Sequence, residues 1–228
     1  MATHVQSPAP ASLARRLSVA ARPSTWPLLL QTTLAMAAGF SVLTYISPLL
    51  SRAGHYHGAT ISIALLVFGV ASVAGSTLGG RLPDRFGAFP VVVAGLAALT
   101  LAMLALSAAT AASAGWSALA ALAAWGMGGW TFPPSQQHRL AAAAPGDASI
   151  VLGLNSSAMY AGAAIGGVAG GLVLPAGAAY VPALAAGLAA CALICAAAQH
   201  HHAPPATRHP AGSQDHLAKP GNAAPPVG

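Results

Sequence analysis

The side chains that could carry acid–base chemistry are few and far apart in this sequence. Its acidic residues are Asp84, Asp147 and Asp215, and it has no glutamate. Catalysis by one carboxylate acid and one carboxylate base requires both groups beside the same substrate, whereas these three lie in separate segments. No set of Ser, His and Asp, or of Cys and His, falls where a nucleophilic site would be expected. The sequence therefore argues against an enzyme.

The cysteines and histidines also give little indication of a metal site. Cys191 and Cys195 are four residues apart and are interpreted as small membrane hydrophobes, because a metal site needs more ligands and a disulfide framework more cysteines. Five histidines near the C-terminus are an alternative metal site, but a flexible tail lacks preorganised ligand geometry. We expect no metal and no cofactor at these histidines, which are His200, His201, His202, His209 and His216.

Four polar side chains interrupt long apolar runs and are the candidates for a substrate cavity. Gln31 and Tyr45 lie in the first run, and Asn155 and Tyr160 lie in the fifth. A polar side chain in a membrane-spanning helix either faces a substrate path or makes a hydrogen bond to a neighbouring helix. Both interpretations stay open for each of the four.

The composition places the chain in a lipid bilayer. It is 56% hydrophobic and 5% charged, whereas the surface of a water-soluble domain is roughly 25–35% charged. Nine Lys and Arg exceed the three acidic residues, but they lie in the tails and between apolar runs. They therefore indicate membrane topology and not a nucleic-acid surface.

Six apolar runs have about the 20 residues that a helix needs to cross roughly 30 Å of hydrocarbon. They define a transmembrane domain over residues 25–198 of an all-α, polytopic protein. Residues 1–24 are predicted to be a disordered cytoplasmic leader, with a mitochondrial transit peptide as the alternative, and residues 199–228 a disordered cytoplasmic tail rich in His, Pro and Ala. The predicted spans are residues 26–50, 60–79, 89–113, 116–134, 150–174 and 180–198. A break is predicted in the first span, near Pro48. The fourth span is predicted to end at Pro133 and Pro134, followed by an interfacial loop over residues 135–149.

The basic residues predict the orientation of these spans. With six spans, Arg52 falls alone on one side of the membrane. Because Lys and Arg are enriched on the cytoplasmic side, both termini are predicted to be cytoplasmic. The basic residues on that side are Arg15, Arg16, Arg22, Arg81, Arg85, Arg139, Arg208 and Lys219.

Glycines at four-residue spacing predict which helices pack closely. Gly75 and Gly79 lie in the second span, and Gly162, Gly166 and Gly170 lie in the fifth. Small residues on one stripe let two helix backbones approach each other within lipid. We therefore predict that these two spans are inner helices, and that the plainer third and sixth spans face lipid.

A short motif of glycines and charges joins the second and third spans. Gly80, Leu82, Asp84, Arg85 and Gly87 form the pattern G-x-L-x-D-R-x-G, which resembles the signature loop of the major facilitator superfamily. In that family, the acidic and basic residues of the loop latch the two halves of the transporter in one conformation. The resemblance implies such a gating role here; a solvated turn is the alternative.

The resemblance extends over residues 12–198 and is to the C-terminal half of sugar and drug efflux permeases. Residues 44–50 resemble the seventh helix of these permeases, and residues 155–171 resemble the eleventh. It implies a bundle of six helices in a 3+3 inverted repeat, with substrate moving along discontinuous helices. Pro83 in place of a small residue, and Ala88 and Phe89 in place of basic residues, depart from the family pattern and weaken the charge cluster of the loop.

The expected function is therefore the transport of small molecules such as sugars or drugs, outward and by alternating access, in the bacterial inner membrane. Because six helices supply one of the two bundles that alternating access needs, a second six-helix unit is the expected partner, either another copy or a separate chain. The alternative is a non-transporting membrane subunit or a degenerate fragment of a larger permease.

Overall fold

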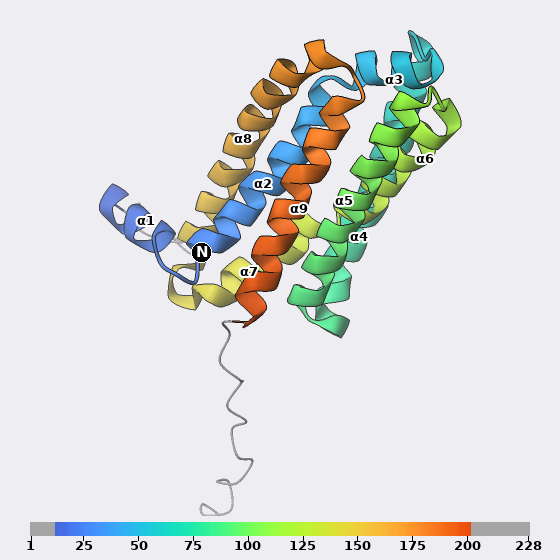
Figure 1. The fold of residues 1–228 in the computed structure, drawn as a ribbon. Helices are drawn as coiled ribbons and strands as arrows, with labels where there is room; N and C mark the ends of the chain where they lie inside the picture. Colours follow the sequence, from blue (N-terminus) through green and yellow to red (C-terminus); the bar gives the residue numbers. More distant parts are fainter. Residues whose placement is uncertain (1–11, 202–228) are drawn as a thin grey trace, which may run out of the picture.

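The computed structural model of the chain describes residues 12–201, and every regular element in that range is a helix (Figure 1). Part of the predicted leader forms α1, and the predictions for residues 1–11 and 202–228 lie outside the described residues. The elements are α1 (Leu13–Ala20), α2 (Trp26–Thr44), α3 (Ile46–Gly54), α4 (Ala59–Phe86), α5 (Ala88–Ala111), α6 (Gly115–Ala124), the π-helix η1 (Trp125–Gly129), α7 (Phe132–Ala143), the 3-10 turn η2 (Pro145–Asp147), α8 (Ala148–Val173), the 3-10 turn η3 (Leu174–Ala176) and α9 (Tyr180–His201).

The long helices stand side by side as a row, in the order α8, α2, α9, α5 (Figure 1). At the far end of the row, α5 also packs on α6, η1 and α7, and α4 packs on η1. One apolar core runs through α2, α3, α5, α6 and α9. Five helices are long and apolar enough to cross a membrane: α2, α4, α5, α8 and α9.

The segment predicted as the fourth span is divided into three pieces. Its first piece, α6, lies beside α3, and its last piece, α7, lies at the opposite end of the molecule (Figure 1). The π-helix between them is rich in glycine, and α7 begins with Pro133 and Pro134. Proline is tolerated in the first turn of a helix, where its missing N–H has no partner to lose. The prediction that the prolines end the span, with a loop over residues 135–149, is therefore wrong, because they begin α7.

The first predicted span is also discontinuous, at Tyr45, between α2 and α3. Pro48 lies one turn after the last residues of α2 and has no N–H to donate to the carbonyl of Thr44. The break that the sequence predicts near Pro48 is present in the structure.

The signature motif is helical and is not a loop. Residues from Gly80 to Phe86 form the last turns of α4, and Gly87 alone connects α4 to α5 with a φ of 83°, which favours glycine. Pro83 lies inside this helix and leaves the carbonyl of Gly79 without its usual donor. The hydroxyl of Ser135 donates to that carbonyl over 2.9 Å, so α4 continues past the proline.

The predicted order of inner and outer helices is reversed in this chain. The third and sixth spans, α5 and α9, are the more buried, and α9 fills the space between α2 and α5. Small side chains make this possible, because Ala185, Ala189 and Ala192 on one face of α9 are fully buried. The helices with glycine stripes, α4 and α8, lie at the ends of the row and expose most of their surface.

The glycines at four-residue spacing lie where two backbones meet. A Cβ on Gly166 of α8 would collide with the carbonyl oxygen of Ala37 in α2 and lie 2.9 Å from its carbonyl carbon. Gly162 and Gly170 face the backbone of the same helix in the same way. In α4, Gly75 and Gly79 likewise lie against the backbone of residues 126–131.

Replacing Gly166 with leucine should separate α8 from α2, because the contact is made with rigid backbone. We expect a loss of at least about 3 kcal/mol, the upper end of the usual cost of overpacking, seen as a lower midpoint of thermal unfolding in mild detergent. Gly153→Leu is the matched control, since nothing lies within 4 Å of a Cβ there. Equal stability of the two variants would show that the α8–α2 contact is not close.

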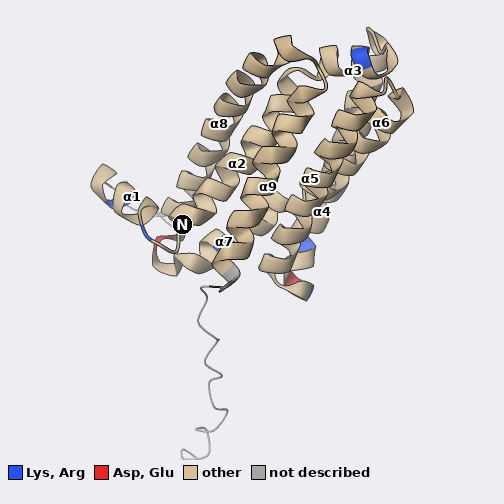
Figure 2. Ribbon diagram, in the orientation of Figure 1, with Lys and Arg blue, Asp and Glu red and all other residues tan. Residues whose placement is uncertain are grey.

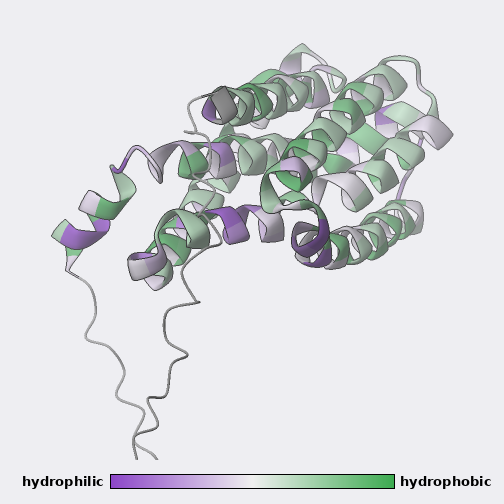
Figure 3. Ribbon diagram, turned by 90° about the horizontal axis from the view of Figure 1, so that it is seen from below, coloured by the Kyte–Doolittle hydropathy of each residue, from purple (hydrophilic) through white to green (hydrophobic). Residues whose placement is uncertain are grey.

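Apart from Arg52, which lies in α3, the charged residues of the described range gather at one end of the row. Figure 2 shows this end, which carries α1, α7 and the α4–α5 junction. Seen from that end, hydrophilic residues lie in α1 and at the helix ends, while the long helices are mainly apolar (Figure 3). This separation of charge is the pattern from which the orientation was predicted, and the orientation itself stays a prediction.

Cysteine labelling should reveal this orientation. In a background without Cys191 and Cys195, a cysteine at the exposed His57 should react with an impermeant thiol reagent added to intact cells. A cysteine at the exposed Phe86, at the other end of α4, should react only after the membrane is opened. The opposite pattern would place the termini outside the cell.

Candidate functional site

A network of polar side chains joins α7 to α2 and α9. Gln136 and Arg139 are three residues apart and so share one face of α7. The Nε2 of Gln136 donates to the carbonyl of Leu28 over 2.8 Å and to the Oε1 of Gln31 over 3.1 Å. Arg139 donates to the same Oε1 of Gln31 over 3.1 Å, to Gln136 over 3.3 Å and to the Oε1 of Gln199 over 2.8 Å. The three helices are thereby tied together by hydrogen bonds.

The guanidinium of Arg139 is half-buried and has no acidic partner in the described range. Its hydrogen bonds go to three glutamine oxygens, and its central carbon lies 5.2 Å from the ring centre of Phe89. Both ion pairs of the described residues involve Asp147 and not Arg139. A charge removed from water is stabilised chiefly by an opposite charge, so this site has an unmatched positive charge.

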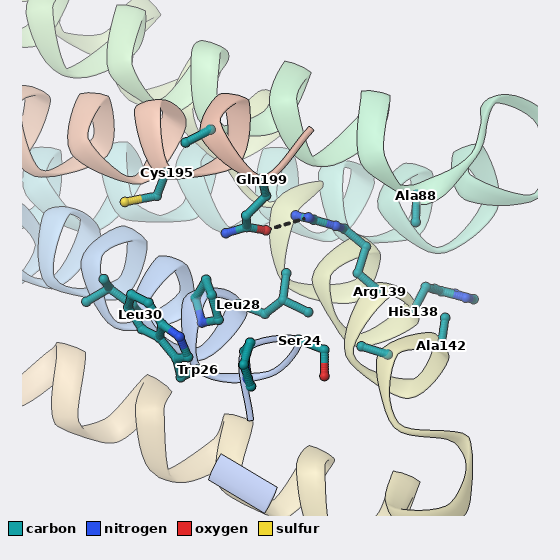
Figure 4. A pocket seen from close by; sticks show the side chains of 14 residues that line it. Ser24, Trp26, Leu28, Leu30, Ala88, His138, Arg139, Ala142, Cys195 and Gln199 are labelled. Atoms are coloured by element: carbon teal, nitrogen blue, oxygen red, sulfur yellow. Dashed lines mark hydrogen bonds between the residues drawn. The ribbon is translucent and has the colours of Figure 1, made fainter. Parts of the chain in front are cut away.

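Arg139 and Gln199 line a pocket of about 960 Å³ (Figure 4), which we call the arginine pocket. It is bounded by α2 and the segment before it, by α7 and by the last turns of α9, with Ala88 at the start of α5. Its lining residues are Pro23, Ser24, Trp26, Pro27, Leu28, Leu30, Ala88, His138, Arg139, Ala142, Ala143, Cys195, Ala198 and Gln199.

The four residues predicted to line a substrate cavity do not lie together, and none of them lines the arginine pocket. Gln31 belongs to the glutamine–arginine network. Asn155 accepts a hydrogen bond from Thr32 over 2.8 Å, and Tyr45 donates to the carbonyl of Gly167 over 2.9 Å. These three make contacts between helices. Tyr160 is different, because it is 78% exposed on the open face of α8.

The residues of the signature motif lie at the end of α4. Asp84 is exposed and makes no ion pair with another described residue, and Arg85 lies over the ring of Phe86 at 5.3 Å. Leu82 is half-buried. The gating role of this motif remains a prediction.

An ion-pair cluster that sequence reasoning missed holds α1 against the start of α8. Asp147, just before α8, accepts from Arg15 over 2.7 Å and pairs with Arg22 over 2.9 Å. The hydrogen bond from Arg15, together with that from Arg22, holds the pKa of the Asp147 carboxyl below its ordinary value. No local pattern connects residues so far apart in the sequence. We call Arg15, Arg22 and Asp147 the arginine clasp.

The glutamine–arginine network was missed for a different reason. The spacing of Gln136 and Arg139 was visible, but the segment was predicted to be a loop, in which three-residue spacing does not place side chains on one face.

No group of three or more His, Cys, Asp or Glu side chains that could hold a metal ion comes together within residues 12–201.

Comparisons with known proteins agree with the arrangement of apolar helices. A sequence model described as Major Facilitator Superfamily matches residues 13–225. The inner membrane transport protein YdhP of Escherichia coli K12 is 34% identical over 187 residues, which are 79% of this chain and 46% of that protein. The uncharacterized MFS-type transporter YbcL of Bacillus subtilis strain 168 is 31% identical over 144 residues, 61% of this chain and 36% of that protein.

A shorter match is found with the chloramphenicol resistance protein of Streptomyces lividans. It is 40% identical over 62 residues, 27% of this chain and 16% of that protein. In each of these comparisons the chain spans less than half the length of the relative.

Replacing Asp147 with asparagine should release α1 from α8, because the neutral amide no longer pairs with two cations. We expect trypsin to cleave several-fold faster at Arg15, Arg16 and Arg22 in the detergent-solubilised variant near neutral pH. The lowered pKa means that the clasp is complete above the ordinary pKa of a carboxyl and is lost only as the pH falls through the lowered value. Asp84→Asn, at an exposed carboxylate without an ion pair, should leave the cleavage rate unchanged; equal rates in the two variants would contradict the role of the clasp.

Proposed function

Because the chain belongs to the major facilitator superfamily, we propose that it is one six-helix half of a small-molecule transporter and works with a second six-helix unit. The coarse function, membrane transport, follows from the family. The need for a second unit is supported by the mechanism of alternating access, in which two bundles move about a central site. The partner is another copy of this chain or a separate chain that supplies the other half.

The observation that carries this proposal is the open surface of α4 and α8. Each of these helices buries one narrow face, which contains its glycine stripe, and exposes large apolar side chains elsewhere. The exposed faces include Ile63, Leu66, Val70 and Val73 of α4, and Ile165, Val168 and Leu172 of α8.

Polar groups on the same surface distinguish it from a plain lipid-facing one. Ser156, Ser157 and Tyr160 are all exposed on the first half of α8, and the hydroxyl of Tyr160 has no hydrogen-bond partner among the described residues. Polar groups at membrane depth usually face protein or a water-filled path. We therefore assign Tyr160 to the substrate path between the two units, while Gln31, Tyr45 and Asn155 shape its wall through their contacts between helices.

The positions of the helix breaks favour the 3+3 arrangement. If α6, η1 and α7 together form one crossing, residues 12–201 contain six crossings. Each group of three then begins with a broken helix: α2 with α3, and α6 with α7. Discontinuous helices at matching positions of two repeats commonly mark a substrate path. On this arrangement both termini are cytoplasmic, and Asp84 and Arg85 lie on the cytoplasmic side, where they would latch the second unit.

The proposed direction is export, and the proposed substrates are sugars or drugs. The resemblance to efflux permeases and the match to a chloramphenicol resistance protein support the drug class. The exposed polar groups on α8 are hydroxyls and carry no charge, which suits a neutral substrate.

Transport should depend on the density of the chain in the membrane. We expect the uptake of radiolabelled chloramphenicol, or of a labelled monosaccharide, into proteoliposomes to rise with the square of protein density, or to appear only with a co-expressed second half. Flux that is proportional to density, down to single copies in each liposome, would overturn the need for a second unit. Absence of flux under all these conditions would favour a non-transporting subunit.

A matched pair of variants tests where the second unit docks. Val168 of α8 and Leu101 of α5 are both 66% exposed and apolar, but only Val168 lies on the proposed interface. Val168→Trp should reduce flux at least about tenfold by blocking close contact, equivalent to about 1.4 kcal/mol, whereas Leu101→Trp should leave it unchanged. The reverse result would place the partner on α5.

A further inference from the structure

We propose that the arginine pocket binds the phosphate headgroup of an anionic phospholipid. This inference concerns a lipid site on one half and does not depend on the proposed transport. The pocket has a volume of about 960 Å³ and combines a half-buried cation with mainly apolar walls.

The first argument is the surplus of hydrogen-bond donors at Arg139. A guanidinium has five N–H groups, and Arg139 uses three hydrogen bonds, all to glutamine oxygens. The Nε2 of Gln199, which also lines the pocket, is buried and has no partner among the described residues. Because unpaired buried donors are costly, the site is suited to a ligand that brings acceptors. A phosphate offers oxygens that accept such hydrogen bonds and a negative charge that matches the guanidinium.

The second argument is the apolar wall that leads away from this cation. Leu28 and Leu30 of α2 line the pocket together with Cys195 of α9 (Figure 4). Ala198 of α9 lines it as well. Farther along α9, Ile194 is 66% exposed. An acyl chain attached to a phosphate at Arg139 could lie along these two helices, whereas a free phosphate would leave the apolar wall uncovered.

The third argument is the position of the pocket in the molecule. It lies at the end of the row where the basic residues gather (Figure 2), and Trp26, half exposed, stands at its edge. Tryptophan is enriched where hydrocarbon meets the headgroups. Basic pockets between membrane helices at the cytoplasmic surface are suited to anionic headgroups.

The binding can be measured on the purified full chain in a mild non-ionic detergent, by native mass spectrometry with added lipid. We expect phosphatidylglycerol to bind about tenfold more tightly than phosphatidylcholine, and Arg139→Gln to remove this preference, since one charge-assisted contact accounts for a difference of that size. Arg81→Gln removes an exposed charge at the same end and should preserve it. Equal binding of the two lipids, or a preference that survives Arg139→Gln, would overturn the proposal.

A second pair of variants leaves the hydrogen-bond network intact, in case Arg139→Gln fails to fold. Ala198 lines the pocket and Ala183 lies at the other end of α9, and both are exposed. Ala198→Trp should fill the pocket and weaken phosphatidylglycerol binding about tenfold, while Ala183→Trp should not change it. Inorganic phosphate that competes fully with the lipid at millimolar concentration would assign the site to free phosphate and contradict the lipid proposal.

Discussion

The contact between the backbones of α8 and α2 sets the spacing of the whole row of helices. Lipid supplies no hydrophobic drive between helices, so their association rests on close packing. Gly162, Gly166 and Gly170 allow this packing at one end of the row, and Gly75 and Gly79 allow it at the other. Between these ends, the alanines of α9 bring α2 and α5 together. Small side chains therefore set the distances between these helices, while larger side chains such as Leu96, Trp125 and Phe132 fill the rest of the core.

Close packing of this kind leaves little tolerance for backbone groups without partners. Pro83 would free a carbonyl in α4, and Ser135 donates to it. The break at Tyr45 is held by the tyrosine itself, whose hydroxyl reaches the backbone of α8. The proline in α4 is thus compensated by a side chain from α7, and the break at Tyr45 is fixed by a hydrogen bond to α8. Such contacts between helices allow broken helices to persist in a chain that spans a membrane.

The sequence predicted the features that depend on local chemistry. The apolar runs, the glycine stripes and the break near Pro48 all follow from residue types and short spacings. It could not predict that Pro133 and Pro134 begin a helix, because proline is compatible with both the end of one helix and the first turn of the next. The order of inner and outer helices was misjudged because a glycine stripe indicates that one face of a helix packs closely, but not how much of its remaining surface is covered. The arginine clasp and the glutamine–arginine network join distant segments, which no local pattern reveals.

The arginine clasp also constrains the order in which the molecule is completed during synthesis. Arg15 and Asp147 are 132 residues apart, and ribosomes add roughly 5–20 residues per second. The arginines of α1 therefore emerge on the order of ten seconds before their carboxylate does. During that interval α1 has no carboxylate partner. It can dock only after Asp147, at the start of α8, has been synthesised.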